Sequence, residues 1–255
     1  MDPDTNEINP YASPAVIEDP ATGALPTDAV SKYGPYRDNR KLAAWLVGLL
    51  GFGIVLSFLR GVLNLAYTLT DFGADPKQVS MIEGIMGGVG MVAIATMIVF
   101  GTWIVRSAKN AWLFAEVTRL HSRLGFHVKQ AVVDDAPGWA VGWYFIPIAS
   151  LWKPYTAMQD IVAASTMQQG PPSFLLPTWW TLWIVSTVSD NASGFLNDPE
   201  MVESLGFKAV AWTVLSGIKV ALHIVAIVLV RSITTLQTDT ATAMAEAPPA
   251  DFPPS

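Results

Sequence analysis

The chain has 255 residues, of which 51% are hydrophobic and only 14% are charged, about half the charged fraction of ordinary soluble domains. This composition excludes a soluble globular enzyme, a disordered protein and a basic nucleic-acid-binding protein, and the long uncharged blocks indicate an integral membrane protein. Because the sequence contains no cysteine, disulfides and thiolate metal sites are also excluded.

The two ends of the sequence differ in composition from the middle. The net charge of −6 comes from residues 1–30, which hold six acidic residues and no Lys or Arg. Residues 1–31 and 239–255 are rich in Pro and Ala, and we expect both to be disordered tails. Between them we expect a transmembrane domain over residues 32–238. Its first apolar block begins only after about 40 residues, which argues against a cleavable signal peptide.

Four apolar blocks are candidates for membrane-spanning helices, since about 20 apolar residues cross the hydrocarbon core. Their approximate bounds are residues 42–70, 84–105, 174–189 and 209–230. Small residues in the second block predict close contact with a neighbouring helix. These residues are Gly84, Gly87, Gly88, Gly90 and Gly101.

A fifth apolar stretch, residues 136–152, is uncharged but short and is interrupted by Pro147. Lys and Arg gather before the first block and after the second, and Arg231 follows the fourth. The positive-inside rule then predicts four spans, with both termini in the cytoplasm. We therefore expect residues 136–165 to form a Trp-rich re-entrant or interfacial helix on the cytoplasmic side. A fifth span across residues 136–152 is the alternative.

Three ionisable residues within the spans form a candidate polar site, because such groups are costly inside a bilayer. Arg60 lies deep in the first block, and Lys219 and His223 lie four residues apart on one face of the fourth. Counting from the outer ends puts Arg60 and Lys219 at similar depth, with no obvious acidic partner. The group would attract an anion or exchange a proton through His223. The simpler interpretation is that all three are structural.

Residues 137–165 are rich in Trp and Tyr, which prefer the membrane–water interface. Trp139 and Trp143 are four residues apart and should share a helical face. Pro147 and Pro154 are expected to bend the path. The segment either lines a substrate path, as interrupted transporter helices do, or packs against the cytoplasmic end of the bundle.

The run from Pro137 to Ser165, PGWAVGWYFIPIASLWKPYTAMQDIVAAS, resembles the signature PGWAVGWWFIPIxNLxxPYxAMxE of a bacterial membrane family, domain of unknown function 4328. Ser150 stands where that family usually has Asn. The resemblance covers roughly residues 40–237 and implies a multi-pass protein of the bacterial inner membrane, but no reaction. The positions that carry it in the central block are Pro137, Trp139, Trp143, Pro147, Trp152, Pro154 and Tyr155. Similar positions elsewhere are Trp103, Arg106, Asn110, Trp179, Trp180, Val230, Arg231, Ile233, Thr234 and Gln237.

The sequence contains no HExxH, GxSxG, Walker A or GxGxxG motif. We therefore predict no catalytic residues, no metal, no cofactor and no enzymatic activity. Residues 106–129 hold five basic residues and one acidic residue, and they are predicted to be attracted to anionic lipid headgroups.

Taken together, these features predict a non-enzymatic scaffold or accessory subunit of a membrane complex. Its expected partners are the lipid bilayer and a membrane protein or a second copy of the chain, and no nucleic acid. The alternative is a small transporter or channel for an anion, a lipid or a proton-coupled solute that uses Arg60, Lys219 and His223. An intramembrane enzyme acting on lipid is the third hypothesis, and it lacks a nucleophile.

Overall fold

The computed structural model describes residues 30, 34–69, 76–123, 136–166, 174–197 and 205–246. The regular elements in these ranges are all helices, which confirms the predicted all-α fold class. The four long helices are α2 (Arg40–Leu69), α3 (Pro76–Arg123), α6 (Leu175–Asn197) and α7 (Leu205–Glu246). Between α3 and α6 lie the short elements α4 (Trp139–Gly142), η1 (Trp143–Phe145), η2 (Ala149–Leu151) and α5 (Lys153–Ser165).

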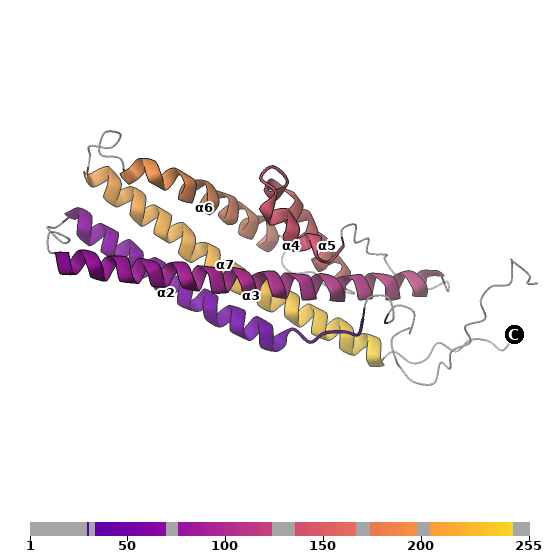
Figure 1. The fold of residues 1–255 in the computed structure, drawn as a ribbon. Coiled ribbons are helices and arrows are strands. Elements are labelled where there is room, and N and C mark those ends of the chain that lie inside the picture. Colours follow the sequence, from indigo (N-terminus) through magenta and orange to yellow (C-terminus); the bar gives the residue numbers. More distant parts are fainter. Residues whose placement is uncertain are drawn as a thin grey trace, which may run out of the picture.

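Among the described residues, three helices are long and apolar enough to cross a membrane, over Arg40–Ala66 in α2, Gly87–Arg119 in α3 and Gly206–Glu246 in α7. Helix α2 runs opposite to α3 and α7, so the start of α2 and the ends of α3 and α7 share one end of the bundle (Figure 1). We call this the basic end, because its helix ends carry several cations. These are Arg37, Arg40, Lys41, Lys109 and Arg119.

The outward faces of these helices carry large apolar side chains. Trp45 is 73% exposed, Phe58 67% and Met91 74%. A helix on the surface of a soluble protein would carry polar residues at such positions, whereas a lipid environment favours apolar ones. The chain is therefore a membrane-embedded helical protein.

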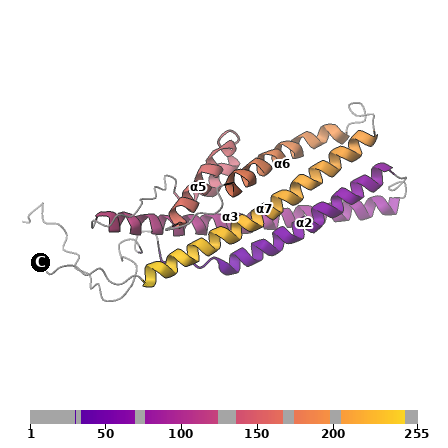
Figure 2. The same cartoon turned by 180° about the vertical axis from the view of Figure 1, so that it is seen from behind.

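The stretch 136–152 does not form one long helix. Its elements α4, η1 and η2 have at most four residues each, and the chain folds back beside α3 (Figure 2). The stretch therefore contains no continuous helix, and the alternative of a fifth helical span across residues 136–152 is wrong. Ile146 adopts an extended backbone before Pro147, which breaks the helical path as predicted. Pro154, in contrast, does not bend a helix, because it lies in the first turn of α5, where its missing N–H is not needed.

The core lies where α2, α3, α5, α6 and α7 meet. Its largest buried side chains come from all five helices, and they include Leu46, Trp103, Met158, Trp179 and Leu229. A second, smaller cluster lies farther toward the basic end and consists of Leu113, Phe114, Val117 and Met244. It joins the last turns of α3 and α7.

This second cluster explains why two helices run past their predicted ends. The predicted spans stop at residues 105 and 230, but α3 continues to Arg123 and α7 to Glu246. Residues 239–246, predicted to be disordered, are therefore helical, because Met244 packs against α3 and Thr240 donates a 2.8 Å hydrogen bond to the Ser165 carbonyl. The rest of that predicted tail, residues 247–255, and residues 1–29 lie outside the described residues.

Close helix packing does involve glycine, but not the glycines expected. A Cβ built at Gly84, Gly87, Gly88 or Gly90 meets no other described atom within 4 Å, and at Gly101 it makes an ordinary 3.6 Å contact with Val141. The tight approaches are in α2 instead. There a Cβ on Gly53 would lie 2.6 Å from His223 Nε2, and one on Gly61 would lie 2.9 Å from Ser216 Cβ. The small residues of α2 let α7 come close.

We expect Gly61→Ala to destabilise the protein, because the new methyl group and Ser216 Cβ cannot both fit unless α2 and α7 move apart. Overpacking of this kind costs about 1–3 kcal/mol. Gly48→Ala is the matched control, since its added methyl group meets nothing within 4 Å. Thermal unfolding in detergent measures both, and equal stability of the two variants would contradict the close approach.

Candidate functional site

A cavity of about 570 Å³ lies inside the bundle, between α2, α3, η1, α6 and α7. Its lining on α3 runs from Val89 to Ile104, a length of about 22 Å at 1.5 Å per residue. Most of the wall is apolar. The charged groups that line it are Arg60, Asp190, Lys219 and His223. The three residues of the predicted polar site therefore line one cavity, together with an acidic residue that was not predicted.

Arg60 lies on α2 with its guanidinium carbon 5.5 Å from the centre of the Trp212 ring on α7. A cation over an indole face is attracted by the ring electrons. This contact leaves the guanidinium donors available to other groups, and no described carboxylate forms an ion pair with Arg60.

Lys219 does not face the cavity as an isolated cation. Its Nζ lies 2.5 Å from Asp190 Oδ1 on α6, so the prediction that no acidic group shares its depth is wrong. The reason is that α6 continues to Asn197, past the predicted end at residue 189, which brings Asp190 within the helix and beside α7. The pair leaves Lys219 with little net charge to offer an anion.

His223 makes a structural hydrogen bond and also lines the cavity. Its Nδ1 donates a 2.6 Å hydrogen bond to the Lys219 carbonyl one turn earlier, and its ring packs against Gly53 on α2. The ring also lines the cavity. His223 thus has a structural hydrogen bond at one nitrogen while the other side of the ring faces α2.

Tyr144 in η1 was not identified as a site residue from the sequence. Its ring meets Trp183 edge-on, with centroids 5.6 Å apart, and both residues line the cavity. The Tyr144 hydroxyl is buried and has no hydrogen-bond partner among the described residues. A buried polar group without a partner costs about 1–3 kcal/mol, so the fold bears this cost beside the aromatic wall of the cavity.

Beside the cavity, a buried hydrogen-bond network joins α7 to three other segments. The Gln237 amide on α7 accepts from Asn110 Nδ2 at 3.1 Å and from Asn39 Nδ2 at 3.5 Å. It donates to the Ser107 carbonyl at 2.9 Å and to Ser165 Oγ at 3.1 Å. All four hydrogen-bonding positions of the amide are therefore occupied.

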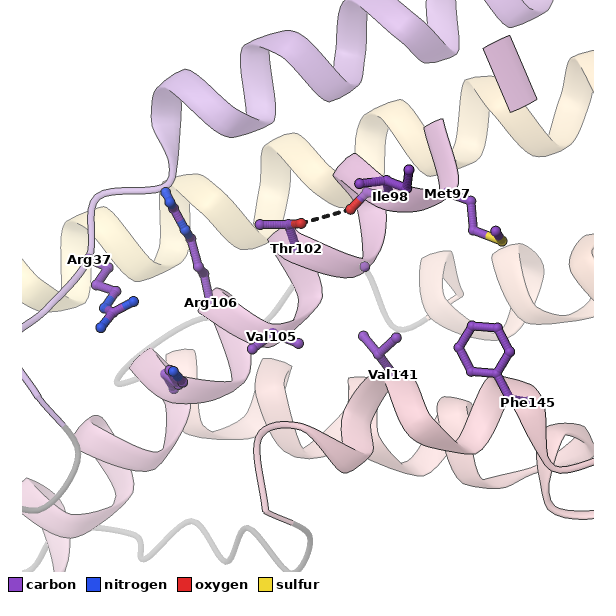
Figure 3. A pocket seen from close by; sticks show the side chains of 10 residues that line it. Arg37, Met97, Ile98, Thr102, Val105, Arg106, Val141 and Phe145 are labelled. Atoms are coloured by element: carbon purple, nitrogen blue, oxygen red, sulfur yellow. Dashed lines mark hydrogen bonds between the residues drawn. The ribbon is translucent and has the colours of Figure 1, made fainter. Parts of the chain in front are cut away.

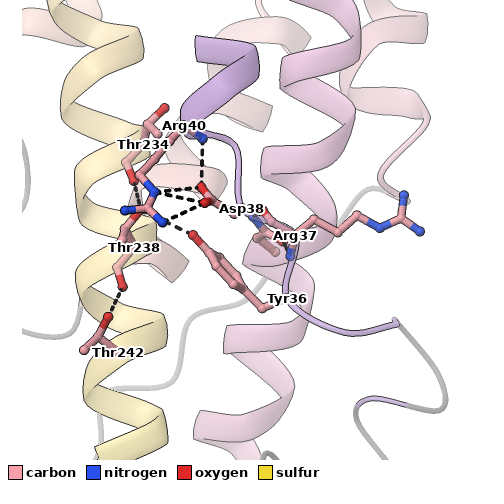
Figure 4. A network of polar contacts seen from close by, with 8 residues as sticks. Tyr36, Arg37, Asp38, Arg40, Thr234, Thr238 and Thr242 are labelled. Carbon is pink, nitrogen blue, oxygen red and sulfur yellow. Dashed lines mark hydrogen bonds and ion pairs between the residues drawn. The ribbon is translucent and has the colours of Figure 1, made fainter. Parts of the chain in front are cut away.

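Asn110 also fixes the chain just before α2. Its Oδ1 accepts from the Arg37 backbone N–H at 3.0 Å, and its Nδ2 donates to the Arg37 carbonyl at 2.9 Å. Close by, the Asp38 carboxylate accepts from the backbone N–H of Arg40 and pairs with its guanidinium (Figure 4). The hydrogen bond from the Arg40 side chain holds the pKa of Asp38 below its usual value.

Trp103, seven residues before Asn110, faces the same interior. Its Nε1 donates to Thr234 Oγ1 at 3.1 Å, and its ring stacks on Phe100 with centroids 5.9 Å apart. Trp103, Asn110, Thr234 and Gln237 are residues that carry the family resemblance, and in the structure all four are buried partners of one helix junction. Arg106, between Trp103 and Asn110, lines a separate groove.

The Trp- and Tyr-rich residues 137–165, which we call the aromatic block, have a buried side and an exposed side. The Trp139 and Trp143 rings lie 4.8 Å apart, as their spacing predicted, and Lys153 Nζ lies 5.0 Å from the centre of the Trp143 ring. Tyr155 packs against Trp180, and Pro154 is buried. The exposed side carries Trp139, Phe145, Ile146, Ile148, Leu151 and Trp152.

Ser150, where the resembling family usually has Asn, is buried between η1 and α5. Its hydroxyl donates a 2.7 Å hydrogen bond to the Pro147 carbonyl. The Ser150 hydroxyl, which is shorter than an Asn side chain, is thus satisfied within its own turn. Among the described residues it makes no hydrogen bond to another element. Pro137 precedes α4 in the turn that begins at Ala136.

Comparison with known proteins identifies the family of the chain. The sequence model of the family described as domain of unknown function DUF4328 matches residues 77–235, which is more than half of the chain. The chain belongs to this family. No curated protein and no solved structure matches it significantly. The DUF4328 match spans α3, the aromatic block, α6 and most of α7, and it therefore includes three of the four charged cavity residues.

Within the described ranges, no group of three His, Asp or Glu side chains is close enough to hold a metal ion.

We expect Gln237→Met to lower the free energy of unfolding by at least about 2 kcal/mol, because it leaves several buried polar partners unsatisfied and each costs about 1–3 kcal/mol. The thioether side chain has a similar length, so the cavity term is small. Gln159→Met, at an exposed position of α5, is the matched control and should change stability by less than about 0.5 kcal/mol. Unfolding in a denaturing detergent titration measures both variants, and similar losses would disprove the role of the network.

Proposed function

We propose that this DUF4328 protein is a non-enzymatic membrane protein that holds a small anionic amphipathic molecule in its intramembrane cavity. The supporting observation is the cavity itself, which is lined by charged groups from α2, α6 and α7 and by apolar and aromatic side chains elsewhere. Ligand sites are typically apolar cavities with a few polar groups that fix orientation. Of the functions considered from the sequence, we therefore favour one related to the transporter alternative over the scaffold role.

The proposed topology has four spans, with α6 as the fourth beside α2, α3 and α7. Helix α6 has 23 residues, enough for a length of about 35 Å, and it packs along α7. The aromatic block would lie at the membrane interface with its exposed apolar side toward lipid. The positive-inside rule then favours the basic end, and both termini, on the cytoplasmic side of the bacterial inner membrane.

This topology predicts which positions react with a membrane-impermeant thiol reagent in intact cells. We expect a Cys introduced at Asp198 to be labelled from outside, and a Cys introduced at Lys41 to be labelled only after the membrane is opened. Because the natural chain has no Cys, each label reports one position. Labelling of both positions from the same side would exclude the four-span arrangement.

The charge of the site indicates the charge of the ligand. The polar end of the cavity is formed by Arg60, Asp190, Lys219 and His223. Arg60 and Lys219 contribute two positive charges and Asp190 one negative charge, so with a neutral His223 this end has a net charge of +1. A single negative charge would balance it. Since Lys219 is already paired with Asp190, Arg60 is the group that a bound anion would contact.

The shape of the cavity indicates the rest of the ligand. From the depth of Arg60, the lining continues along α3 past Phe100 to Ile104 and meets Trp179 and Tyr144. A molecule with an ionised head and an apolar body would bury its body against these side chains, and burial of apolar area is favourable at about 25 cal/mol per Å².

A fluorescent carboxylate, dansylaminoundecanoic acid, tests the proposal with the full chain in lipid nanodiscs. Saturable energy transfer from protein Trp to the dansyl group is expected, because Trp183 lines the cavity and Trp212 contacts Arg60. A charge-assisted hydrogen bond contributes about 1.5–3 kcal/mol, so Arg60→Gln should weaken binding about tenfold or more.

Two controls make this result specific. Arg231→Gln removes the same charge from an exposed position of α7 outside the cavity and should leave binding unchanged. The methyl ester of the probe, which has no charge, should bind wild type and Arg60→Gln equally. Non-saturable transfer, or an Arg60→Gln variant that binds the acid as well as wild type does, would exclude the proposed function.

A further inference from the structure

A second space of about 560 Å³ lies on the surface of the bundle, between α3, α4, η1 and the segment before α2. We call it the basic groove. Figure 3 shows Arg37 and Arg106 at one end and Met97 and Phe145 at the other. Lys109 completes the charged end. None of the described residues that line this groove is acidic, in contrast to the lining of the intramembrane cavity.

The three cations are held in place by the fold. Arg106 and Lys109 are three residues apart on α3 and therefore lie on the same face. The backbone of Arg37 is fixed on α3 by the two hydrogen bonds to the Asn110 amide. The cations thus come from two segments that are far apart in sequence and joined by a buried side chain.

The side chains of these cations have no ion-pair partner within the described part of the chain. Other cations nearby do have partners, since Arg40 pairs with Asp38 and Arg119 with Glu116. Three like charges gathered in one groove repel one another, and a bound anion relieves that repulsion. Arginine in addition presents a planar fork of donors that matches a phosphate group.

The other half of the groove is apolar and exposed. Met97, Ile98 and Phe145 are each more than half exposed, and Thr102 satisfies its hydroxyl within α3 by donating to the Ile98 carbonyl at 2.8 Å. The distance along α3 from Lys109 to Met97 is about 18 Å at 1.5 Å per residue. The groove therefore runs from a cationic end to an apolar end, along the axis of a helix that is long and apolar enough to span the bilayer.

We propose that the basic groove binds an anionic phospholipid from the leaflet at the basic end. The phosphate contacts Arg37, Arg106 and Lys109, and one acyl chain lies along Met97, Ile98 and Phe145. A soluble anion would satisfy the cations but leave the apolar half exposed, whereas a lipid from the surrounding bilayer covers both halves. This site is separate from the proposed cavity ligand, because its charged residues do not line the intramembrane cavity.

Native mass spectrometry of the full chain, titrated with phosphatidylglycerol and phosphatidylcholine of distinguishable acyl mass, tests this proposal. We expect one phosphatidylglycerol to bind at least about tenfold more tightly than phosphatidylcholine, since each basic residue near a membrane surface strengthens the attraction to anionic lipid. Arg106→Gln combined with Lys109→Gln should remove that preference. Exchanging the two charges, as Arg106→Lys with Lys109→Arg, should retain it.

Arg231→Gln is the matched control, because it removes one cation from an exposed position outside the groove. It should change the preference by less than about twofold. Equal binding of the two lipids, or an equal loss in the Arg231→Gln variant, would overturn the proposal. So would displacement of phosphatidylglycerol by millimolar inorganic phosphate, which would assign the groove to a free anion. These outcomes are independent of the dansyl probe, since neither Arg106 nor Lys109 lines the cavity.

Discussion

The amide of Gln237 determines how the helices meet at the basic end. In the interior of a membrane protein, no bulk water replaces a lost hydrogen bond, so a buried amide stabilises only the arrangement that satisfies it. Gln237 is fully buried, and its four hydrogen bonds lead to the segment before α2, to α3 and to α5. A shift of α7 by one residue would break all four. The apolar contacts around it are less specific, because they tolerate sliding.

At the other side of the cavity, α2 and α7 are held by shape rather than by polar groups. Gly53 makes room for the His223 ring, and Gly61 makes room for Ser216. The helices therefore meet closely at these glycines and through the network at the basic end. The cavity lies beside these junctions, and the aromatic side chains of Phe100, Trp179 and Trp183 form part of its wall. The position of the cavity therefore follows from two kinds of contact between the helices, which are close packing at glycines and the hydrogen bonds of Gln237.

Much of the fold could be predicted from the sequence, because uncharged blocks and basic flanks are local signals. The ends of the helices were harder to predict. The extension of α3 to Arg123 and of α7 to Glu246 depends on the second cluster, in which Met244 packs with α3 residues that are far from it in sequence. The pairing of Lys219 with Asp190 was missed for a similar reason, since counting depth from the span ends assumed that α6 stops before Asp190.

The residues of the candidate site divide in the same way, into those that a local sequence signal reveals and those that only the folded structure reveals. Arg60, Lys219 and His223 were identified because a charge in an apolar block is conspicuous on its own. Tyr144 was overlooked beside Trp143, since an aromatic residue in an aromatic block carries no signal until its hydroxyl is found buried. Gln237 matched a family pattern, but its role becomes apparent only when Asn39, Asn110 and Ser165 converge on it.

Four residues, Met97, Gly101, Val141 and Phe145, line both the intramembrane cavity and the basic groove. The two compartments therefore share part of their lining. A substitution at any of these four positions changes both linings at once. A bulkier residue there cannot reshape one compartment and leave its neighbour unchanged.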